Sequence, residues 1–131
     1  MIDAALSSDN PKALVPTQDE SGHGTFLASV AAGGADVENQ FLGAAPESKL
    51  AIVKLKPAKK YLKEVYLITE EKECYQENDI MLGMRYLNEL ANRYDMPLVI
   101  CIALGSNMGG HNATLPITGL LEMYANIANR A

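Results

Sequence analysis

Two short, continuous apolar runs constrain the fold of this chain most strongly. Residues 49–55 (KLAIVKL) and 97–104 (PLVICIAL) are rich in aliphatic and β-branched side chains, and each has the length of a strand. A run without polar alternation is typical of a strand that is covered on both faces. We therefore expect both segments to be buried strands.

Two further segments carry helix signals at their ends. Residues 26–32 combine small and apolar side chains and run into Gly33 and Gly34, which indicates a short buried helix with a glycine C-cap. Residues 116–131 predict another helix, because Pro116 is well suited to the first turn.

The segment before the second apolar run has helical periodicity. Asn78 or Asp79 could cap a helix that runs to about Tyr94. Its apolar positions form one face at helical spacing: Ile80, Met81, Met84, Leu87, Leu90 and Ala91. Within 56–77, residues 61–68 fit either a helix or a strand, and we treat this stretch as an inserted element.

The order helix, strand, helix, strand, helix predicts the fold class. It is typical of an α/β fold, with a parallel sheet and helices on both of its faces. The 131 residues fit a single domain, and that length can bury a core of modest size.

The sharpest chemical signal is His23, which lies between Gly22 and Gly24 where the first helix opens. A nucleophilic hydroxyl needs a nearby imidazole to take its proton, and flanking glycines let another backbone and a substrate come close. The start of a helix also disfavours the protonated imidazole, which helps to keep such a base neutral. The alternative is a histidine that only begins a helix in a turn.

Three motifs, in order, resemble those of the subtilases, the subtilisin-like serine proteases. Residues 21–33 (SGHGTFLASVAAG) are similar to the family's catalytic-histidine motif. Residues 41–55 resemble its Gly-x-Ala-Pro turn and the strand that follows, and residues 98–106 (LVICIALGS) resemble the strand that borders the substrate cleft. Residues 74–91 are most similar to the subtilisin-like germination proteases of spore-forming bacteria.

The resemblance implies roles for particular residues and a three-layer fold. His23 would be the general base of a Ser-His-Asp triad. Ala103, Leu104 and Gly105 would line the cleft, where main-chain groups pair with an extended substrate. Ala103 stands where the family more often has serine, which backbone pairing tolerates.

The other catalytic parts of a subtilase do not occur in this sequence. Asp3 lacks the apolar run expected before a triad aspartate, no Gly-Thr-Ser-x-Ala motif is present, and Asn107 is not in the setting of an oxyanion donor. We therefore expect residues 1–131 to be the central part of a catalytic domain, truncated at both ends and inactive alone. The parent protein would be the serine endopeptidase.

Two other function classes remain open. The parent could be a pseudoprotease that keeps the fold but acts by binding, since two triad positions lie outside this sequence. Residues 104–110 (LGSNMGG) vaguely resemble a phosphate-binding loop, which would suggest a nucleotide-binding α/β domain. They lack both the P-loop Lys-Ser/Thr and the GxGxxG spacing.

Composition excludes some partners. The net charge of −5 argues against nucleic acid, and no apolar run approaches the roughly 20 residues that cross a bilayer. No signal peptide is recognisable, so the compartment is unknown; the family suggests secretion or spore association for the parent. The expected partners are a peptide or protein substrate of the parent and other copies of this chain, through the exposed edges of a truncated sheet.

No cofactor or metal is expected for this chain. Asp36, Glu38, Asn39 and Gln40 lie in a loop where many subtilases bind calcium, so calcium in the full-length parent stays open, although an ordinary polar turn is favoured. His111 is expected to be a solvent-exposed loop histidine. Cys101 is expected to be a buried thiol, and a disulfide with Cys74 is not favoured.

Overall fold

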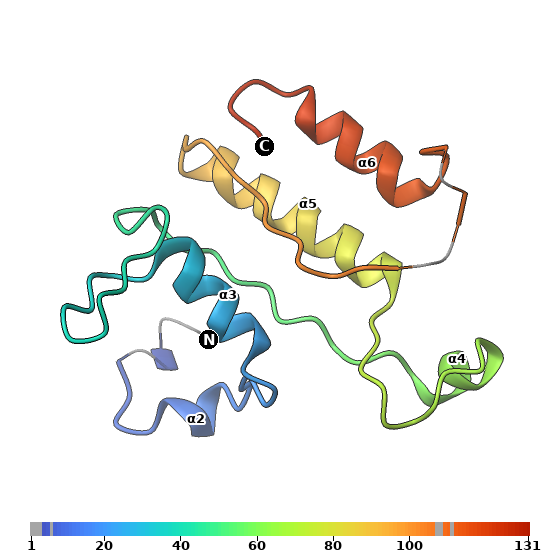
Figure 1. Cartoon of the computed structure of the whole chain (residues 1–131), viewed down its shortest axis with the longest axis horizontal. Helices are drawn as coiled ribbons and strands as arrows, with labels where there is room; N and C mark the ends of the chain where they lie inside the picture. The colour runs from blue at the N-terminus through green and yellow to red at the C-terminus, as the bar shows by residue number, and fades with distance from the viewer. Residues whose placement is uncertain (1–3, 6, 107–108, 111) are drawn as a thin grey trace. The chain divides into compact units, whose positions relative to one another are not determined.

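The structure is a computed structural model that describes residues 4–5, 7–106, 109–110 and 112–131. Along these residues run the helices α2 (Pro11–Leu14), α3 (His23–Ala32), α4 (Lys60–Val65), α5 (Glu77–Arg93) and α6 (Pro116–Ala125), as labelled in Figure 1. The chain divides into two compact units, Met1–Lys54 and Leu55–Ala131, and each is described by itself.

The prediction of an α/β fold with a parallel sheet is wrong. Neither residues 49–55 nor residues 97–104 form a strand, and the described part of the chain contains only two isolated β-bridges, Asp36 with Phe41 and Leu98 with Arg130. A strand exists only through hydrogen bonds to a neighbour, and apolar β-branched composition supplies no neighbour by itself. The partial three-layer arrangement, with helices on both faces of a sheet, is therefore absent from the described residues.

The second apolar run does find one partner, at the end of the chain. Leu98 donates its N–H to Asn129 O at 2.9 Å, Ala131 donates to Leu98 O at 2.9 Å, and Ile100 donates to Ala131 O at 2.7 Å. This alternation is the hydrogen-bond pattern of a parallel pair, and the bridge between Leu98 and Arg130 is parallel. The pairing is too short to count as a strand.

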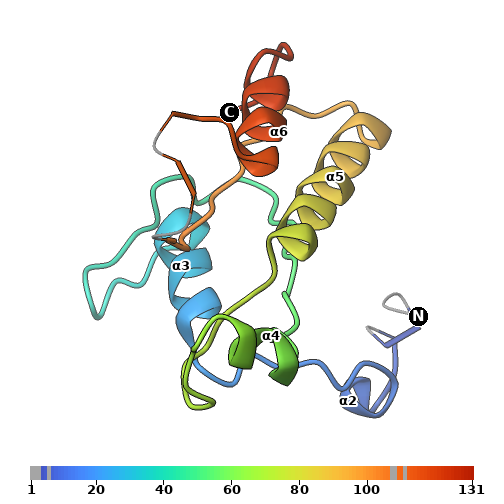
Figure 2. The ribbon, with the colours of Figure 1, turned by 90° about the vertical axis from the view of Figure 1, so that its right-hand side faces the viewer.

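The second unit builds its small core between α5 and α6. The two helices lie side by side and run in the same direction in both views (Figures 1 and 2). Met84 and Ala91 on α5 and Tyr124 on α6 are buried. Since Met84 and Ala91 are seven residues apart, both lie on the same helix face, as the sequence pattern predicted.

The bounds of α5 agree with the expected helix, but its cap does not. The helix begins at Glu77, the N-cap is Gln76 in an extended conformation, and no side chain caps it. The acidic residues of the first turn, Glu77 and Asp79, still favour this end through the helix dipole.

Helix α6 is shorter than the predicted 116–131. It ends at Ala125, and the chain then turns so that Ile127 donates to Tyr124 O at 3.0 Å and Arg130 donates to Ile127 O at 3.2 Å. Asn129 takes a positive φ of 63° in this turn. Asparagine tolerates that conformation better than most residues, so the turn can return the chain to Leu98.

The inserted stretch resolves the helix-or-strand ambiguity in favour of a helix. Helix α4 covers Lys60–Val65, and the side chain of Lys63 donates to the carbonyls of Glu70 at 2.9 Å and Lys72 at 2.6 Å. Ala58 donates to Cys74 O at 2.8 Å, which closes the stretch at its base. Leu67, two residues after the end of α4, has 92% of its surface exposed.

In the first unit, residues 43–45 close the C-terminal end of α3. Gly43, Ala44 and Ala45 donate their N–H groups to the carbonyls of Gly33, Val30 and Ala31, at 3.0, 2.9 and 2.8 Å. The last carbonyls of a helix lack partners within the helix, and here the following loop supplies them. Gly33 itself has an extended backbone, so it is not the left-handed C-cap that the sequence suggested.

The first unit leaves much apolar surface uncovered. None of the ten residues of α3 is buried, and Phe26 is 64% exposed, which contradicts the prediction of a buried helix. Ile52 in the first apolar run is 70% exposed.

The accessible surface of the whole chain is also larger than that of a compact domain. It is 10465 Å² for 14.1 kDa, whereas one compact monomer of that mass exposes about 6,700 Å² and two separate compact halves about 8,100 Å². The chain therefore exposes more surface than a compact domain of its mass, or two compact halves, would. No helix in the described ranges has the length and apolar character needed to cross a bilayer.

Candidate functional site

The loop before α3 is organised by the carboxylate of Asp19. Its Oδ1 accepts hydrogen bonds from the N–H of Gly22 at 2.9 Å and from the hydroxyl of Ser21 at 3.4 Å. Its Oδ2 accepts from the N–H of Thr25 at 2.8 Å and from the Thr25 hydroxyl at 2.7 Å. Both oxygens thus bind donors at the start of α3, which would otherwise lack partners within the helix.

These hydrogen bonds favour the ionised carboxylate. They lower the pKa of Asp19 from 3.8 to about 2, with the Thr25 hydroxyl as the largest cause, followed by the N–H groups of Thr25 and Gly22. The positive end of the α3 dipole acts in the same direction. Asp19 is therefore negatively charged across the whole physiological range.

His23 is the first residue of α3, and it is exposed. Its N–H donates to the Ser21 hydroxyl at 3.4 Å, so its main chain belongs to the same hydrogen-bonded turn as Asp19. Gly22 precedes it with a φ of 77°, in the left-handed region that favours glycine. This explains one of the two flanking glycines: the chain must turn at Gly22 to enter the helix at His23.

The other flanking glycine, Gly24, has a different environment. A Cβ at this position would lie 3.5 Å from Asp19 Oδ2, an ordinary contact distance. Neither the backbone conformation nor a close contact therefore requires glycine at position 24. The missing side chain leaves space beside His23.

The predicted cleft residues lie in the second unit. Ala103, Leu104 and Gly105 follow the paired residues Leu98 and Ile100, and all three are exposed. A Cβ at Gly105 would meet nothing within 4 Å. Because His23 belongs to the first unit, these residues and His23 are described separately.

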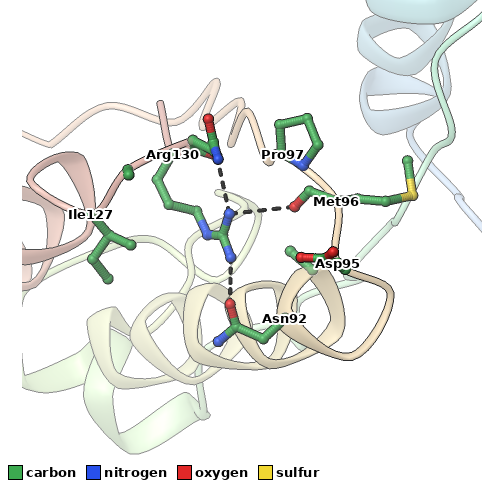
Figure 3. Close-up of a pocket in the computed structure, with 9 residues that line it drawn as sticks. Asn92, Asp95, Met96, Pro97, Ile127 and Arg130 are labelled. Carbon is green, nitrogen blue, oxygen red and sulfur yellow. Dashed lines mark hydrogen bonds between the residues drawn. The ribbon is translucent and has the colours of Figure 1, made fainter.

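Arg130 is one of the residues that line a pocket of about 260 Å³ in the second unit (Figure 3). The guanidinium donates through Nε to Asn88 Oδ1 at 2.9 Å and through Nη1 to the carbonyls of Met96 at 3.3 Å and Asn129 at 3.0 Å. Its Nη2 donates to Asn92 Oδ1. These bonds use most of the guanidinium donors, so Arg130 clamps the end of the chain to α5.

The loop considered for calcium forms a tight turn. The main chains of Asp36 and Phe41 exchange two N–H to O hydrogen bonds, of 2.9 and 3.0 Å. The carboxylate of Asp36 also accepts hydrogen bonds from the side-chain amide of Asn39 at 2.8 Å and from the Asn39 main-chain N–H at 3.1 Å. These bonds lower the pKa of Asp36, with the Asn39 side chain as the main cause. Among the described residues, no group of three or more His, Cys, Asp or Glu side chains could hold a metal ion.

The remaining candidate residues are the two cysteines, which the structure describes, and His111 and Asn107, which it does not. Cys101 is exposed, which contradicts the expected buried thiol, and both Cys74 and Cys101 are free. His111 and Asn107 lie outside the described residues. Exposed and half-buried residues alternate along this segment: Leu98, Ile100 and Ile102 are half-buried, whereas Cys101 lies on the exposed face.

Asp19 is the residue that the sequence reasoning missed. A signal was present, because Asp19 lies four residues before the histidine and six before Thr25, within reach of the first helical N–H groups. The glycine at the N-cap has no side chain of its own, so an earlier acceptor is needed there.

Comparison with known proteins gives the family. The model of the subtilase family matches residues 4–120. The solved structure of the CspB protease from Clostridium perfringens is similar, with a TM-score of 0.79 and 27% sequence identity over 99% of this chain. The chain spans 26% of the length of that protease. No match was found among the curated proteins. Because the family model covers most of the chain, including the His-Gly-Thr segment, this protein belongs to the subtilase family.

Proposed function

We propose that this chain is the histidine-bearing part of a subtilisin-like serine endopeptidase and that His23 is the general base. The observation that carries the proposal is the placement of His23. It is exposed as the first residue of α3, directly after the left-handed Gly22, within the range matched by the subtilase family. An imidazole held at the surface by a rigid turn can accept a proton from a serine hydroxyl that is brought against it.

The serine and the aspartate of the triad would come from residues outside these 131. The sequence contains no Gly-Thr-Ser-x-Ala motif, and the chain covers about a quarter of the similar protease. A general base without a nucleophile and an oxyanion donor has no reaction to catalyse. We therefore expect the isolated chain to hydrolyse no peptide bond.

Residues 103–105 would bind the substrate backbone. All three residues are exposed at the end of the 97–104 segment, which supports this role, because a substrate can reach them from solvent. Pairing of this kind depends on backbone groups, so the alanine at position 103 is compatible with the role.

The test uses the full-length protein that carries this sequence. Peptide hydrolysis and labelling by a fluorophosphonate, which reacts with an activated serine, are compared between the parent protein and its His23→Ala and His111→Ala variants. His23→Ala should lower kcat by on the order of 10⁴-fold or more and abolish labelling. His111→Ala is the matched histidine control and should retain both.

Two results would contradict the proposal. Activity that survives His23→Ala would remove the general-base role. A parent protein that binds peptides but neither turns them over nor reacts with the fluorophosphonate would instead be a pseudoprotease.

We also infer that the isolated chain associates with itself. Association through the exposed edges of a sheet is no longer expected, because the described residues form no sheet. The exposed apolar side chains, among them Phe26, Ile52 and Val99, support association through apolar contacts instead.

A further inference from the structure

We propose that Asp19 is a positioning residue for His23, a role that rests on the proposed general-base function. Asp19 is not a catalytic residue in this proposal, because it would act only through the main chain that carries the imidazole. It fixes where α3 begins and therefore where the side chain of its first residue points.

Asp19 accepts hydrogen bonds from the main chain both before and after His23 in the sequence. The carboxylate binds the N–H of Gly22, the residue before His23, at 2.9 Å, and the N–H of Thr25, two residues after it, at 2.8 Å. The dihedral angles between these two amides set the direction of the His23 Cα–Cβ bond. One carboxylate thus restrains the backbone that places the imidazole.

A second hydrogen bond ties the His23 main chain to the same group. The His23 N–H donates to the Ser21 hydroxyl, and this hydroxyl donates to Asp19 Oδ1, each at 3.4 Å. Gly22 at the N-cap cannot supply a side-chain acceptor. Asp19 therefore performs from three residues away the function that an N-cap side chain performs in most helices.

The loop that carries Asp19 is itself held in place. Lys54 donates from Nζ to the main-chain carbonyl of Gln18, and Lys12 donates to the Gln18 side chain at 3.3 Å. The residue before Asp19 is thus anchored to the end of the 49–55 segment, within the same unit. An anchored acceptor restrains its donors better than one on a mobile loop would.

A positioning role predicts a specific kinetic signature. A misplacement of about 1 Å at a reacting group can cost on the order of 10²-fold in rate, while remote substrate contacts stay intact. In the full-length protein, Asp19→Ala should lower kcat about 10- to 100-fold with KM changed less than about 3-fold. Asp19→Asn keeps one acceptor oxygen and should give an intermediate loss.

Asp36→Ala is the matched control. Asp36 is also an exposed aspartate of the first unit that accepts side-chain and main-chain hydrogen bonds in a loop, but its partner is Asn39 and not the start of α3. This variant should leave kcat unchanged. If Asp19→Ala and Asp36→Ala lower kcat equally, Asp19 has only a general structural role and the inference is overturned.

A spectroscopic measurement on the full-length protein, with its histidines isotope-labelled, supplies a readout independent of turnover. The coupling constants between Hα and Hβ of His23 report its side-chain rotamer. In the unmodified protein they should show one dominant His23 rotamer. In Asp19→Ala they should show averaging over several rotamers, and in Asp19→Asn the dominant rotamer should partly return. Far-UV circular dichroism should confirm that the other helices remain.

The outcomes separate this inference from the proposed function. Loss of activity in His23→Ala, together with unchanged kcat and an unchanged His23 rotamer in Asp19→Ala, would overturn the positioning role alone. Full activity in His23→Ala would overturn the general-base function, and the positioning role with it.

Discussion

The guanidinium of Arg130 donates through Nε to the side-chain oxygen of Asn88, 2.9 Å away, across 42 positions of sequence. A second side chain one turn further along α5, Asn92, accepts from the same group. These bonds hold the last residues of the chain against the C-terminal part of α5, beside the short pairing of Leu98 with Arg130.

Replacing Arg130 with alanine should destabilise the second unit. The substitution leaves Asn88, Asn92 and the carbonyl of Met96 without their charged donor. The bonds to Asn88 and Met96 are partly buried, and a hydrogen bond to a charged group contributes about 1.5–3 kcal/mol. We expect a loss of about 2 kcal/mol or more in the free energy of unfolding, measured by urea titration with circular dichroism.

Arg85→Ala is the control for this substitution. Arg85 pairs with Glu89 at 2.9 Å on the exposed face of α5, and such a pair contributes less than about 0.5 kcal/mol. Equal losses in the two variants would show that Arg130 does not clamp the chain end.

Acid should release the start of α3. The pKa of Asp19 is lowered from 3.8 to about 2, so its contribution to stability is present above about pH 3.8 and is lost as the pH falls through 2. The amide resonance of Thr25 should therefore titrate with a midpoint near 2 and stay flat in Asp19→Asn. A midpoint close to 3.8 in the native chain would contradict the hydrogen bonds described for Asp19.

Gly43→Ala should disrupt the contact between residues 43–45 and the end of α3. A Cβ at Gly43 would lie 2.5 Å from the nitrogen of Gly33 and 2.9 Å from the carbonyl oxygen of Ser29. Backbone must shift to admit it, at a cost of about 1–3 kcal/mol. Chemical denaturation of the chain measures the loss.

Gly34→Ala is the matched glycine control, because a Cβ there would meet nothing within 4 Å. It should change the free energy of unfolding by less than about 0.5 kcal/mol. A similar loss at both glycines would mean that the close approach at Gly43 does not occur.

The isolated chain should associate as its concentration rises. Apolar side chains such as Ile52 and Val99, exposed by 70% and 78%, gain about 25 cal/mol for each Å² that a second copy covers. Sedimentation velocity from micromolar to near-millimolar concentration should show a rising mass, reduced in an Ile52→Ser, Val99→Ser double variant. A single monomeric species across that range would contradict the inference.

The sequence by itself determined those features of this protein that depend on neighbours a few positions away. The bounds of α5, its apolar face around Met84 and Ala91, and the start of a helix at the His-Gly-Thr segment all follow from local spacing and composition, and the order of motifs pointed to the subtilase family. Only the tertiary structure decided that neither apolar run became a strand. Residues 49–55 and 97–104 have strand composition, but a strand needs a continuous hydrogen-bonded neighbour. Leu98 and Ile100 bond to the end of the chain, and this pairing stays an isolated bridge. The role of Asp19 likewise depends on the fold of the loop, which brings its carboxylate to the amides of Gly22 and Thr25. The partners of a side chain depend on how the backbone turns as well as on its sequence position.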